Sequence, residues 1–345
     1  MKLQLMPEND AEKAIFASGQ MPELAMTTWM GGCASYLMAA GVKLGIFEAL
    51  AEGPRTADAL SEDLGFDRHG LKVLLEGLTG FGALRRKEGT FELSADARQW
   101  LLREAPTSLA PMVALFGTIQ SWLGGLESAV RTGEVTNFHF NTDAQGWTDY
   151  LGLLDASGRF DAPALIDTLG LSEPPKRMLD VAGGPGRYSI ALAQAYEQLD
   201  IDILDLEPSA REGRTNIAAA GLDERIRYHV GDMFEHDWPA GPYDLVLVSH
   251  FLHCLTESRC RQILGRAVEQ LGPGGRLAIH EVYIGGEEDE LSAHSVSFSL
   301  VYYTGTGGRC WPMDTYQQWL SDAGLHDVVA RRTPAGAVVV LGTKA

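Results

Sequence analysis

The chain has 345 residues, of which 45% are hydrophobic, and its formal net charge at pH 7 is −18. A chain of this length and composition can bury the cores of about two domains. The acidic excess argues against nucleic acid as a partner, because phosphate backbones bind basic surfaces. A small-molecule partner is favoured instead.

The sequence gives no sign of a membrane segment or of a metal site. Residues 1–11 are polar, unlike a signal peptide, and no apolar run approaches the roughly 20 residues that cross a bilayer. We therefore predict a cytoplasmic protein that does not bind membranes. The cysteines are scattered without a CxxC pair, which argues against structural zinc, and we predict no metal ligand. The four are Cys33, Cys254, Cys260 and Cys310.

Residues 1–104 are predicted to form a mostly helical winged-helix domain. Apolar residues recur at helical spacing over Leu24–Ala51, and Gly53-Pro54 ends that helix. Two shorter helices follow, over residues 56–65 and from Asp67, and then a hairpin that turns at Glu88-Gly89. Residues 1–30 add exposed apolar positions, which favour a protein partner.

Winged helices also occur in DNA-binding regulators. Here the helix that would enter the groove offers only Arg68 and Lys72 as cations, and Glu76 opposes them. Helices that read DNA need several donors to phosphates and bases. A winged-helix regulator that senses a small molecule therefore stays a less favoured alternative.

The second half of the chain changes its pattern. Residues 105–172 are predicted to be a helical linker that helps to form a substrate pocket, and residues 173–345 to be a separate domain. In that domain short apolar runs alternate with helical segments, which predicts a Rossmann-like, seven-stranded, doubly wound α/β sheet. The predicted strands are Met178–Val181, Ile201–Leu206, Ile226–Val230, Tyr243–Ser249, Leu277–Val282, Val328–Arg331 and Ala337–Leu341.

A glycine-rich turn follows the first of these strands. Gly183, Gly184 and Gly186 let a ligand approach the backbone at the start of a helix. Asp205 ends the next strand, where an acid binds a ribose diol in nucleoside-binding sheets. A dehydrogenase that binds NAD(P) shares both features and stays an alternative. However, the carboxylate of Asp180 beside the turn would repel a pyrophosphate and suits a cationic amine and sulfonium.

Several motifs, in order, resemble the class I S-adenosylmethionine (SAM)-dependent methyltransferases. More narrowly, the chain resembles the O-methyltransferases of plant phenolic metabolism and bacterial antibiotic tailoring, which have an N-terminal winged-helix dimerisation domain. Asp180–Gly186 is similar to the family's DVGGGxG, with Ala182 in place of one glycine. Gly231–Phe234 is similar to its GDMF motif, and Leu271–Arg276 to its turn before strand five.

The resemblance implies SAM as cofactor, S-adenosylhomocysteine as its product, and a homodimer formed through the N-terminal domain. It also implies a set of cofactor-binding residues at the ends of the strands. These are Asp180, Gly183, Gly184, Gly186, Asp205, Leu206, Asp232, Met233, Phe234 and Ser249.

Methyl transfer to a hydroxyl benefits from a general base whose pKa is near neutral. Leu252-His253 matches the start of the family's LHDW motif, so His253 is the candidate base, although Cys254-Leu255 replaces Asp-Trp. Glu281 resembles the family's glutamate that orients this histidine, and His250 is a second candidate base. A literal His-Asp-Trp at 236–238 falls in the wrong loop and is set aside.

Aromatic residues suggest a flat, apolar acceptor. The candidate pocket residues are Trp122, Trp147, His250, Phe298, Tyr302 and Tyr303. The sequence thus predicts SAM-dependent O-methylation of an aromatic or polyketide-like small molecule. Plant members of the family place a second glutamate near the position of Cys310 here. Because of that difference and Cys254-Leu255, C- or N-methylation, or a SAM-bound enzyme without methyl transfer, stays open.

Overall fold

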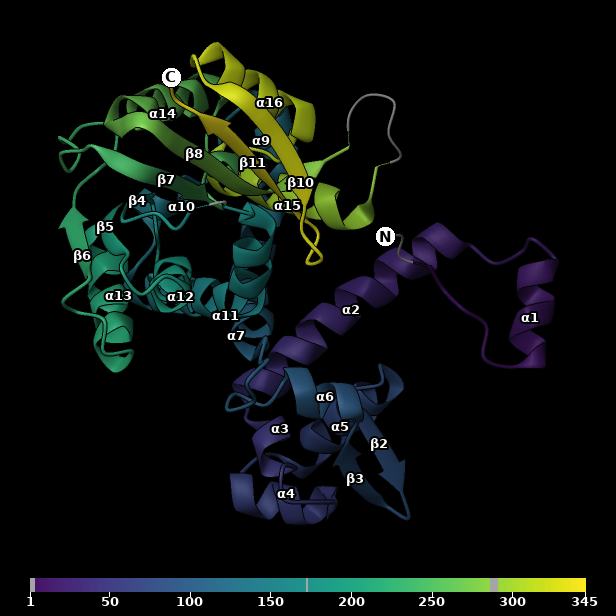
Figure 1. Cartoon of the computed structure of the whole chain (residues 1–345). Coiled ribbons are helices and arrows are strands. Elements are labelled where there is room, and N and C mark those ends of the chain that lie inside the picture. Colours follow the sequence, from purple (N-terminus) through teal and green to yellow (C-terminus); the bar gives the residue numbers. More distant parts are fainter. Residues whose placement is uncertain (1–3, 172, 286–290) are drawn as a thin grey trace. The chain divides into compact units, whose positions relative to one another are not determined.

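The structure, a computed structural model, describes residues 4–171, 173–285 and 291–345. It divides into two compact units, Met1–Gln120 and Ser121–Ala345 (Figure 1). The predicted linker, 105–172, is shared between them: α7 (Ala110–Ala114) belongs to the first unit and α9 (Leu126–Thr132) to the second, while α8 (Phe116–Gly124) contains the boundary. None of the described helices is long and apolar enough to cross a bilayer.

The first unit has the predicted order of helices and hairpin. Its elements are α1 (Asp10–Ala17), α2 (Glu23–Lys43), α3 (Ile46–Ala49), β1 (Arg55–Thr56), α4 (Ala57–Leu64), α5 (Arg68–Gly80), β2 (Leu84–Lys87), β3 (Thr90–Leu93), α6 (Ala95–Trp100) and α7. The helix predicted over Leu24–Ala51 is two helices, because Gly45 adopts a φ of 68° between them. Glu88 and Gly89, at φ of 49° and 81°, make the predicted turn.

Apolar side chains of α2 to α6 form the core of this unit, and those near the N-terminus do not. Phe47, Leu75 and Leu78 are fully buried in that core. By contrast, α1 buries no residue, and Leu24 and Trp29 are 84% and 70% exposed. The predicted exposed apolar segment is therefore present.

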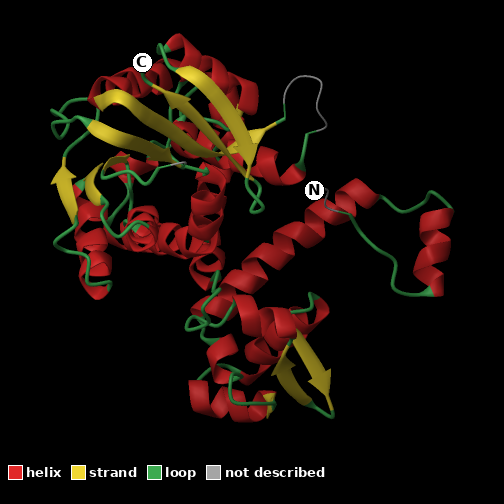
Figure 2. Cartoon of the chain, in the orientation of Figure 1, coloured by secondary structure: helices red, strands yellow, loops and turns green. Residues whose placement is uncertain are grey.

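The second unit contains the predicted seven-stranded doubly wound sheet (Figure 2). Its strands are β4 (Arg177–Val181), β5 (Asp200–Asp205), β6 (Ile226–Val230), β7 (Tyr243–Ser249), β8 (Leu271–Ile284), β10 (His326–Arg332) and β11 (Ala337–Thr343), in the order β10-β11-β8-β7-β4-β5-β6. The strands β6, β5, β4, β7 and β8 are parallel to one another. By contrast, β11 runs antiparallel to both of its neighbours, β8 and β10. The two-residue β9 (Trp311–Pro312) pairs with the end of β8.

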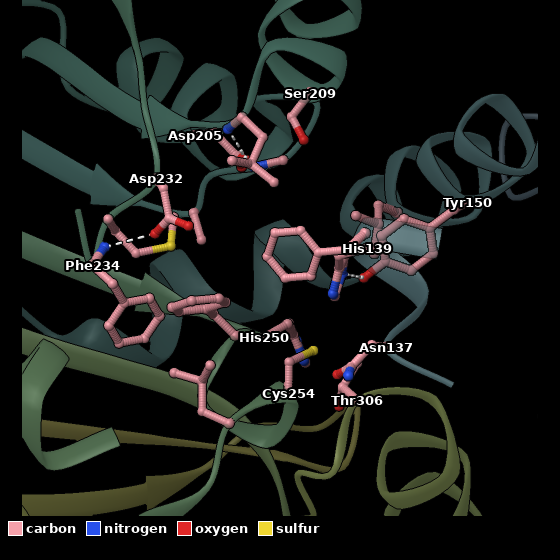
Figure 3. A pocket seen from close by; sticks show the side chains of 18 of the residues that line it. Asn137, His139, Tyr150, Asp205, Ser209, Asp232, Phe234, His250, Cys254 and Thr306 are labelled. Carbon is pink, nitrogen blue, oxygen red and sulfur yellow. Dashed lines mark hydrogen bonds between the residues drawn. The ribbon is translucent and has the colours of Figure 1, made fainter. Parts of the chain in front are cut away.

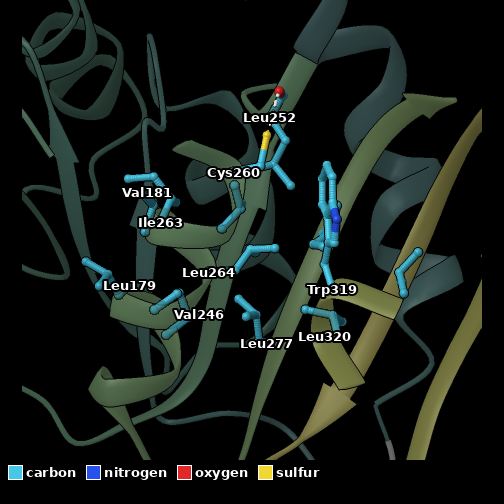
Figure 4. Close-up of a cluster of buried hydrophobic side chains, with 14 of the residues drawn as sticks. Leu179, Val181, Val246, Leu252, Cys260, Ile263, Leu264, Leu277, Trp319 and Leu320 are labelled. Carbon is cyan, nitrogen blue, oxygen red and sulfur yellow. Dashed lines mark hydrogen bonds between the residues drawn. The ribbon is translucent and has the colours of Figure 1, made fainter. Parts of the chain in front are cut away.

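Helices cover both faces of this sheet. The helices of the second unit after α8 are α9, α10 (Phe138–Asn141), α11 (Ala144–Leu169), α12 (Arg187–Ala195), α13 (Glu207–Ala219), the 3₁₀ helix η1 (Leu252–Cys254), α14 (Glu257–Gln270), α15 (Ala293–Thr306) and α16 (Met313–Asp322). Alternate strand residues enter two cores. Leu179 and Val246 pack with α14 and α16 on one face (Figure 4), while Met178 and Leu247 pack with α11 and α12 on the other. Both faces of the central strands are thus buried, which fixes the register of the strand ends that form the site.

Candidate active site

The glycine turn after β4 leaves space for a ligand. Gly184 and Gly186 have positive φ, and so does Ala182, at 59°. A Cβ on Gly183 would lie 2.7 Å from both Asp180 Oδ2 and Ile203 Cγ2, so only glycine fits there. Ala182 and Gly184 line a pocket at the carboxyl ends of the strands. This is the edge at which open α/β sheets bind ligands.

Asp205, at the end of β5, connects this turn to the next strand. Its Oδ2 accepts a hydrogen bond from the Gly184 N–H (2.7 Å), and its Oδ1 from the Leu206 N–H (2.6 Å). The side chain is buried, and burial raises the pKa of Asp205 although these hydrogen bonds act in the opposite direction. Asp205, Leu206 and Ser209 all line the pocket.

Asp180 lies behind the turn and does not line the pocket. Its Oδ2 accepts a hydrogen bond from Ser189 Oγ (2.7 Å), while its buried Oδ1 has no partner among the described residues. Burial, together with the charge of Asp205, raises the pKa of Asp180 to about 7. At neutral pH this group therefore holds only part of the negative charge expected from the sequence.

The loop after β6 forms one side of the pocket with Asp232, Met233 and Phe234. Asp232 Oδ1 accepts a hydrogen bond from the Phe234 N–H (2.8 Å), and the Arg259 guanidinium lies 4.5 Å from the centre of the Phe234 ring. The buried Trp238 donates from Nε1 to the Met233 carbonyl (2.9 Å). The 236–238 stretch, set aside in the sequence, thus supports this loop.

The pocket continues from these residues toward α10 and α11. Figure 3 shows Asp205 and Ser209 at one end and Asn137 and Thr306 at the other. Trp147 and His250, two of the predicted pocket residues, are among the lining residues. Lining residues that the sequence analysis did not select as site residues are Asn137, His139, Phe140, Tyr150, Leu154, Ala182, Ser209, Phe251, Cys254, Leu255, Arg259 and Thr306.

Trp122, Phe298, Tyr302 and Tyr303 are not among the residues that line this pocket. Trp122 packs against Phe138, with ring centres 4.5 Å apart, and the Tyr303 hydroxyl donates to the Ala129 carbonyl. Tyr302 stacks on the His253 ring at 3.6 Å, and Phe298 stacks on Tyr302 at 6.1 Å. Tyr302 and Phe298 therefore lie behind the candidate base.

His253 and Glu281 meet as a buried pair. His253 Nδ1 lies 2.6 Å from Glu281 Oε2, and both side chains are almost fully buried. Glu281 Oε1 accepts hydrogen bonds from the N–H groups of Phe251 (2.7 Å) and Leu252 (2.6 Å), at the start of η1. Burial acts to raise the pKa of Glu281, but the charge and hydrogen bond of His253, together with the charge of His250 and the Leu252 N–H, lower it overall. One carboxylate thus fixes both the η1 backbone and the imidazole.

Neighbouring segments hold η1 in place. A Cβ on Gly308 would lie 2.1 Å from the His253 carbonyl oxygen, so the loop after α15 contacts the η1 backbone directly. Cys310, near the family's second glutamate in sequence, is fully buried beside Val282 and Ile284. His253 itself is not among the pocket-lining residues, but Phe251, Cys254 and Leu255 on either side of it are.

His139 and Tyr150 form part of the far wall of the pocket. His139 Nε2 lies 3.4 Å from the Tyr150 hydroxyl, and burial, aided by the charge of His253, lowers the pKa of His139 to about 4. This imidazole is therefore neutral at neutral pH. No motif surrounds His139 or Tyr150, and only their place on α10 and α11 brings them to the site.

His250 and Ser249 belong to a second buried network. Ser249 Oγ lies 3.0 Å from His280 Nδ1, and Ser249 is not among the pocket-lining residues. His250 Nε2 lies 3.1 Å from Asp161 Oδ2, and His250 has a positive φ of 49°. Such backbone strain in a non-glycine residue is concentrated at functional sites.

The pocket fits the nucleoside part of SAM. A buried acid at the end of β5 can accept hydrogen bonds from a ribose diol, and Met233 and Phe234 offer apolar contacts for a flat base. The glycine turn leaves room because the two of its residues that line the pocket, Ala182 and Gly184, carry at most a methyl group. The donor set and shape therefore match the cofactor that the motifs imply.

The chain matches two protein families. Residues 137–326 match the O-methyltransferase domain, and residues 27–103 the O-methyltransferase dimerisation domain. It is 29% identical over 340 residues to 3-hydroxy-5-methyl-1-naphthoate 3-O-methyltransferase of Streptomyces sahachiroi, covering 94% of this chain and 95% of that one. It is 26% identical to L-tyrosine C(3)-methyltransferase of Streptomyces lavendulae, covering 90% of each.

The fold also matches a solved structure of human N-acetylserotonin methyltransferase in complex with SAM. The TM-score is 0.83 at 21% identity, and the match covers 99% of each chain. The domain match extends over more than half of the sequence and contains the glycine turn, Asp205 and the His253–Glu281 pair. The chain belongs to the O-methyltransferase family, with SAM as its cofactor, and carries that family's dimerisation domain.

Proposed function

We propose that this enzyme methylates a hydroxyl group of a flat, aromatic or polyketide-like small molecule, with His253 as general base. The observation that carries the proposal is the buried contact between His253 Nδ1 and Glu281 Oε2 at 2.6 Å. A carboxylate at Nδ1 fixes the tautomer in which Nε2 can accept a proton, and it stabilises the imidazolium that results. The O-methyltransferase relative from Streptomyces supports this reaction and a fused-ring acceptor.

SAM, when bound, supplies an electrophilic methyl group on its sulfonium. Asp205 and the loop from Asp232 to Phe234 would hold its adenosine, while the rest of the pocket orients the acceptor and excludes water. The aromatic rings of Trp147 and Tyr150 suit a flat acceptor. His253 Nε2 would take the proton of the acceptor hydroxyl, and Glu281 would hold the imidazole in place.

The proposal is tested with His253→Ala. We expect turnover to fall by about 100-fold or more, because a general base contributes roughly 10²- to 10⁴-fold. SAM affinity, measured by calorimetry, should stay that of the native enzyme, since Asp205 and the loop from Asp232 to Phe234, which are proposed to hold the adenosine, are unchanged. His326→Ala, an exposed histidine at the start of β10, is the control. Turnover within a few-fold of that of the native enzyme would contradict the role of His253 as general base. It would show that the enzyme accelerates methyl transfer only by orienting the acceptor toward SAM.

A second candidate is C-methylation of a phenol ring. The relative that methylates C(3) of L-tyrosine favours it. The same base would deprotonate the phenol, and the ring carbon next to the phenolate would then be the nucleophile. After the new C–C bond forms, that carbon would lose its hydrogen as a proton and the phenol ring would be restored. Mass spectrometry and NMR of the methylated product separate the two outcomes, because an O-methyl ether leaves the ring carbons unsubstituted.

We also propose that two copies associate through the N-terminal unit. It matches the dimerisation domain, and its segment from Leu24 to Trp29 exposes large apolar side chains. Light scattering of the full chain, compared with a Trp29→Asp variant, measures the oligomeric state. A native monomer at micromolar concentration would refute the dimer.

A further inference from the structure

We infer that His250 is a second functional histidine at the acceptor site, an imidazolium that donates a hydrogen bond from Nδ1 to the ionised hydroxyl of a phenolic acceptor. The inference rests on the proposed function, because it concerns the hydroxyl from which His253 would take the proton. It narrows the substrate class to phenols whose oxygen ionises readily, in preference to aliphatic alcohols.

The ring of His250 is held in one place at the pocket wall. Its Nε2 lies 3.1 Å from Asp161 Oδ2, and the Tyr188 ring stacks on it with the ring centres 5.9 Å apart. The His250 N–H donates to the His280 carbonyl (2.8 Å), although φ at His250 is 49°. Such a strained conformation persists only where several contacts enforce it, and it is typical of functional sites.

The other ring nitrogen of His250 is open to the pocket. Nδ1 has no hydrogen-bond partner among the described residues, and it is not one of their buried atoms that lack a partner. The side chain is 22% exposed and lines the pocket. In an imidazolium both nitrogens carry a hydrogen, so Nε2 donates to Asp161 while Nδ1 is left to donate to a ligand oxygen.

Carboxylates on two elements, α11 and β8, favour the charged form of His250. Burial acts to lower the pKa of His250, but its hydrogen bond to Asp161 and the charges of Glu281 and Asp161 raise it overall. Burial acts to raise the pKa of Asp161, but the hydrogen bonds and charges of His250 and His280 lower it, so Asp161 is ionised. His250 and Asp161 therefore form an ion pair at the wall of the pocket.

Two other groups contact Asp161, and both are neutral at neutral pH. His280 Nε2 lies 3.1 Å from Asp161 Oδ2, but His280 is fully buried, and burial lowers its pKa. The Tyr188 hydroxyl contacts the same oxygen at 3.4 Å, and burial raises the pKa of Tyr188. Across the pocket, His139 is also neutral, because its pKa is about 4. His250 is therefore the charged one of the two described imidazoles that line the pocket.

His250 also lies next to the candidate base. The ring centres of His250 and His253 are 6.1 Å apart, and one ring nitrogen of each lies within 4.8 Å of the other. The two rings are thus close enough for one acceptor hydroxyl to contact both. Because His250 is already protonated, it cannot take a proton, so the roles separate: His253 accepts the proton and His250 stabilises the anion.

This arrangement lowers the free-energy cost of ionising the acceptor. A phenol such as the side chain of tyrosine has a pKa of about 10 and an imidazole one of about 6.5, so proton transfer to His253 alone is unfavourable. A hydrogen bond from a charged donor stabilises the oxyanion that forms. The oxygen then bonds to the methyl carbon as the carbon–sulfur bond breaks and its electron pair stays on sulfur. The proton stays on His253, and His250 is unchanged.

The ionisation state of a bound phenol tests the inference without turnover. The full chain is saturated with S-adenosylhomocysteine, and hydroxynaphthalenes and hydroxycoumarins are added as probes. Their absorption from about pH 6 to about pH 10 gives the pKa of each bound probe. We expect native protein to lower the pKa of at least one bound probe by about 1 or more, since one hydrogen bond between charged groups favours the phenolate by about ten-fold or more.

Variants assign this shift to one side chain. His250→Asn removes the charge and suits the left-handed backbone, so most of the shift should be lost. Asp161→Asn should also reduce it, because the imidazolium loses its partner. His139→Gln is the matched control, since it alters a neutral imidazole of the same pocket and should leave the shift unchanged. Calorimetry with S-adenosylhomocysteine shows whether each variant keeps its cofactor site.

The charge of His250 is measured separately on the protein alone. NMR titration of isotope-labelled histidines should give His250 a pKa above the usual value of about 6.5 in native protein, and a lower pKa in Asp161→Asn. Three results would each overturn the inference: no probe is bound as phenolate by native protein, His250→Asn keeps the full shift, or His250 of native protein titrates below the usual value.

Turnover of His253→Ala separates this result from the proposed function. If that variant kept native turnover while the shift still depended on His250, the proposed base would be refuted and the role of His250 retained. If turnover fell as expected and His250→Asn kept the full shift, only the inference about His250 would fail.

Discussion

The two ends of the pocket are built in different ways. The end proposed to hold the cofactor, called here the cofactor end, comes from three strand ends, each with a short local motif at 180–186, 205–209 and 232–234. The end proposed to hold the acceptor, called here the acceptor end, comes from α10, α11, η1 and the end of α15, which are far apart in sequence and share no motif. The first end is fixed by the backbone of a buried sheet, whereas the second depends on side chains brought together by helix packing. Substitutions should therefore affect SAM binding at one end and turnover at the other.

The largest effect on SAM binding is expected for Asp205→Ala. The variant loses the acceptor of the proposed ribose hydrogen bonds and the contact to the Gly184 N–H. Hydrogen bonds to charged groups contribute roughly 1.5–3 kcal/mol each, so SAM affinity should fall by about 100-fold in calorimetry. Asp200→Ala, at the exposed start of the same strand, is the control. Equal SAM affinity in both variants would place the cofactor elsewhere.

Asp180 predicts a pH dependence of stability at the cofactor end. The pKa of Asp180 in the folded protein is about 7, above its usual value, so folding favours the protonated carboxyl group. Its contribution to the free energy of unfolding is therefore fully present below about pH 4 and is lost as the pH rises through 7. Between about pH 4 and pH 7, the free energy of unfolding of the native protein should fall by roughly 1.4 kcal/mol per pH unit relative to that of the Asp180→Asn variant. Urea unfolding of both proteins at pH 5 and pH 7 measures this difference. A difference that does not change with pH would contradict the raised pKa.

Trp238→Phe should have a smaller effect. The ring remains, but the hydrogen bond from Nε1 to the Met233 carbonyl is lost. A neutral hydrogen bond contributes about 1 kcal/mol, so SAM affinity should weaken by roughly five-fold while turnover at saturating SAM is unchanged. Trp319→Phe is the matched control, because it makes the same change in a buried tryptophan. The Nε1 of Trp319 has no hydrogen-bond partner among the described residues, so no hydrogen bond is lost. If Trp319→Phe lowered SAM affinity as much, the loss would reflect general packing.

The sheet and the cofactor end could be read from the sequence because their signals are local. Each of these strands contains a short apolar run, such as Met178-Leu179 in β4 and Ile203-Leu204 in β5, and the turn at 182–186 and Asp205 lie at strand ends. His253 and Glu281 were identified by resemblance to the family's motifs. In the structure, His253 Nδ1 lies 2.6 Å from Glu281 Oε2. Their catalytic roles stay predictions.

The acceptor end could not be read in this way. Trp122 and Tyr303 have the aromatic character of a pocket lining, yet they pack among helices, while His139 and Thr306 line the pocket without any pattern nearby. Which face of a helix reaches a cavity depends on packing between distant segments. The same holds for Asp161 and His280, which are more than one hundred residues apart in the chain.

The helix α11 connects the two ends of the pocket. Its first turns carry Trp147 and Tyr150, and its middle carries Asp155, which pairs with Arg187 at the start of α12, directly after the glycine turn. A Cβ on Gly158 would lie 2.8 Å from Arg187 Cβ, so the two helices are in close contact there. An acceptor that shifts α11 should therefore change the position of the turn, which makes the two ligands energetically coupled. Because such coupling is reciprocal, we expect calorimetry to show the same factor whether the acceptor or SAM is bound first.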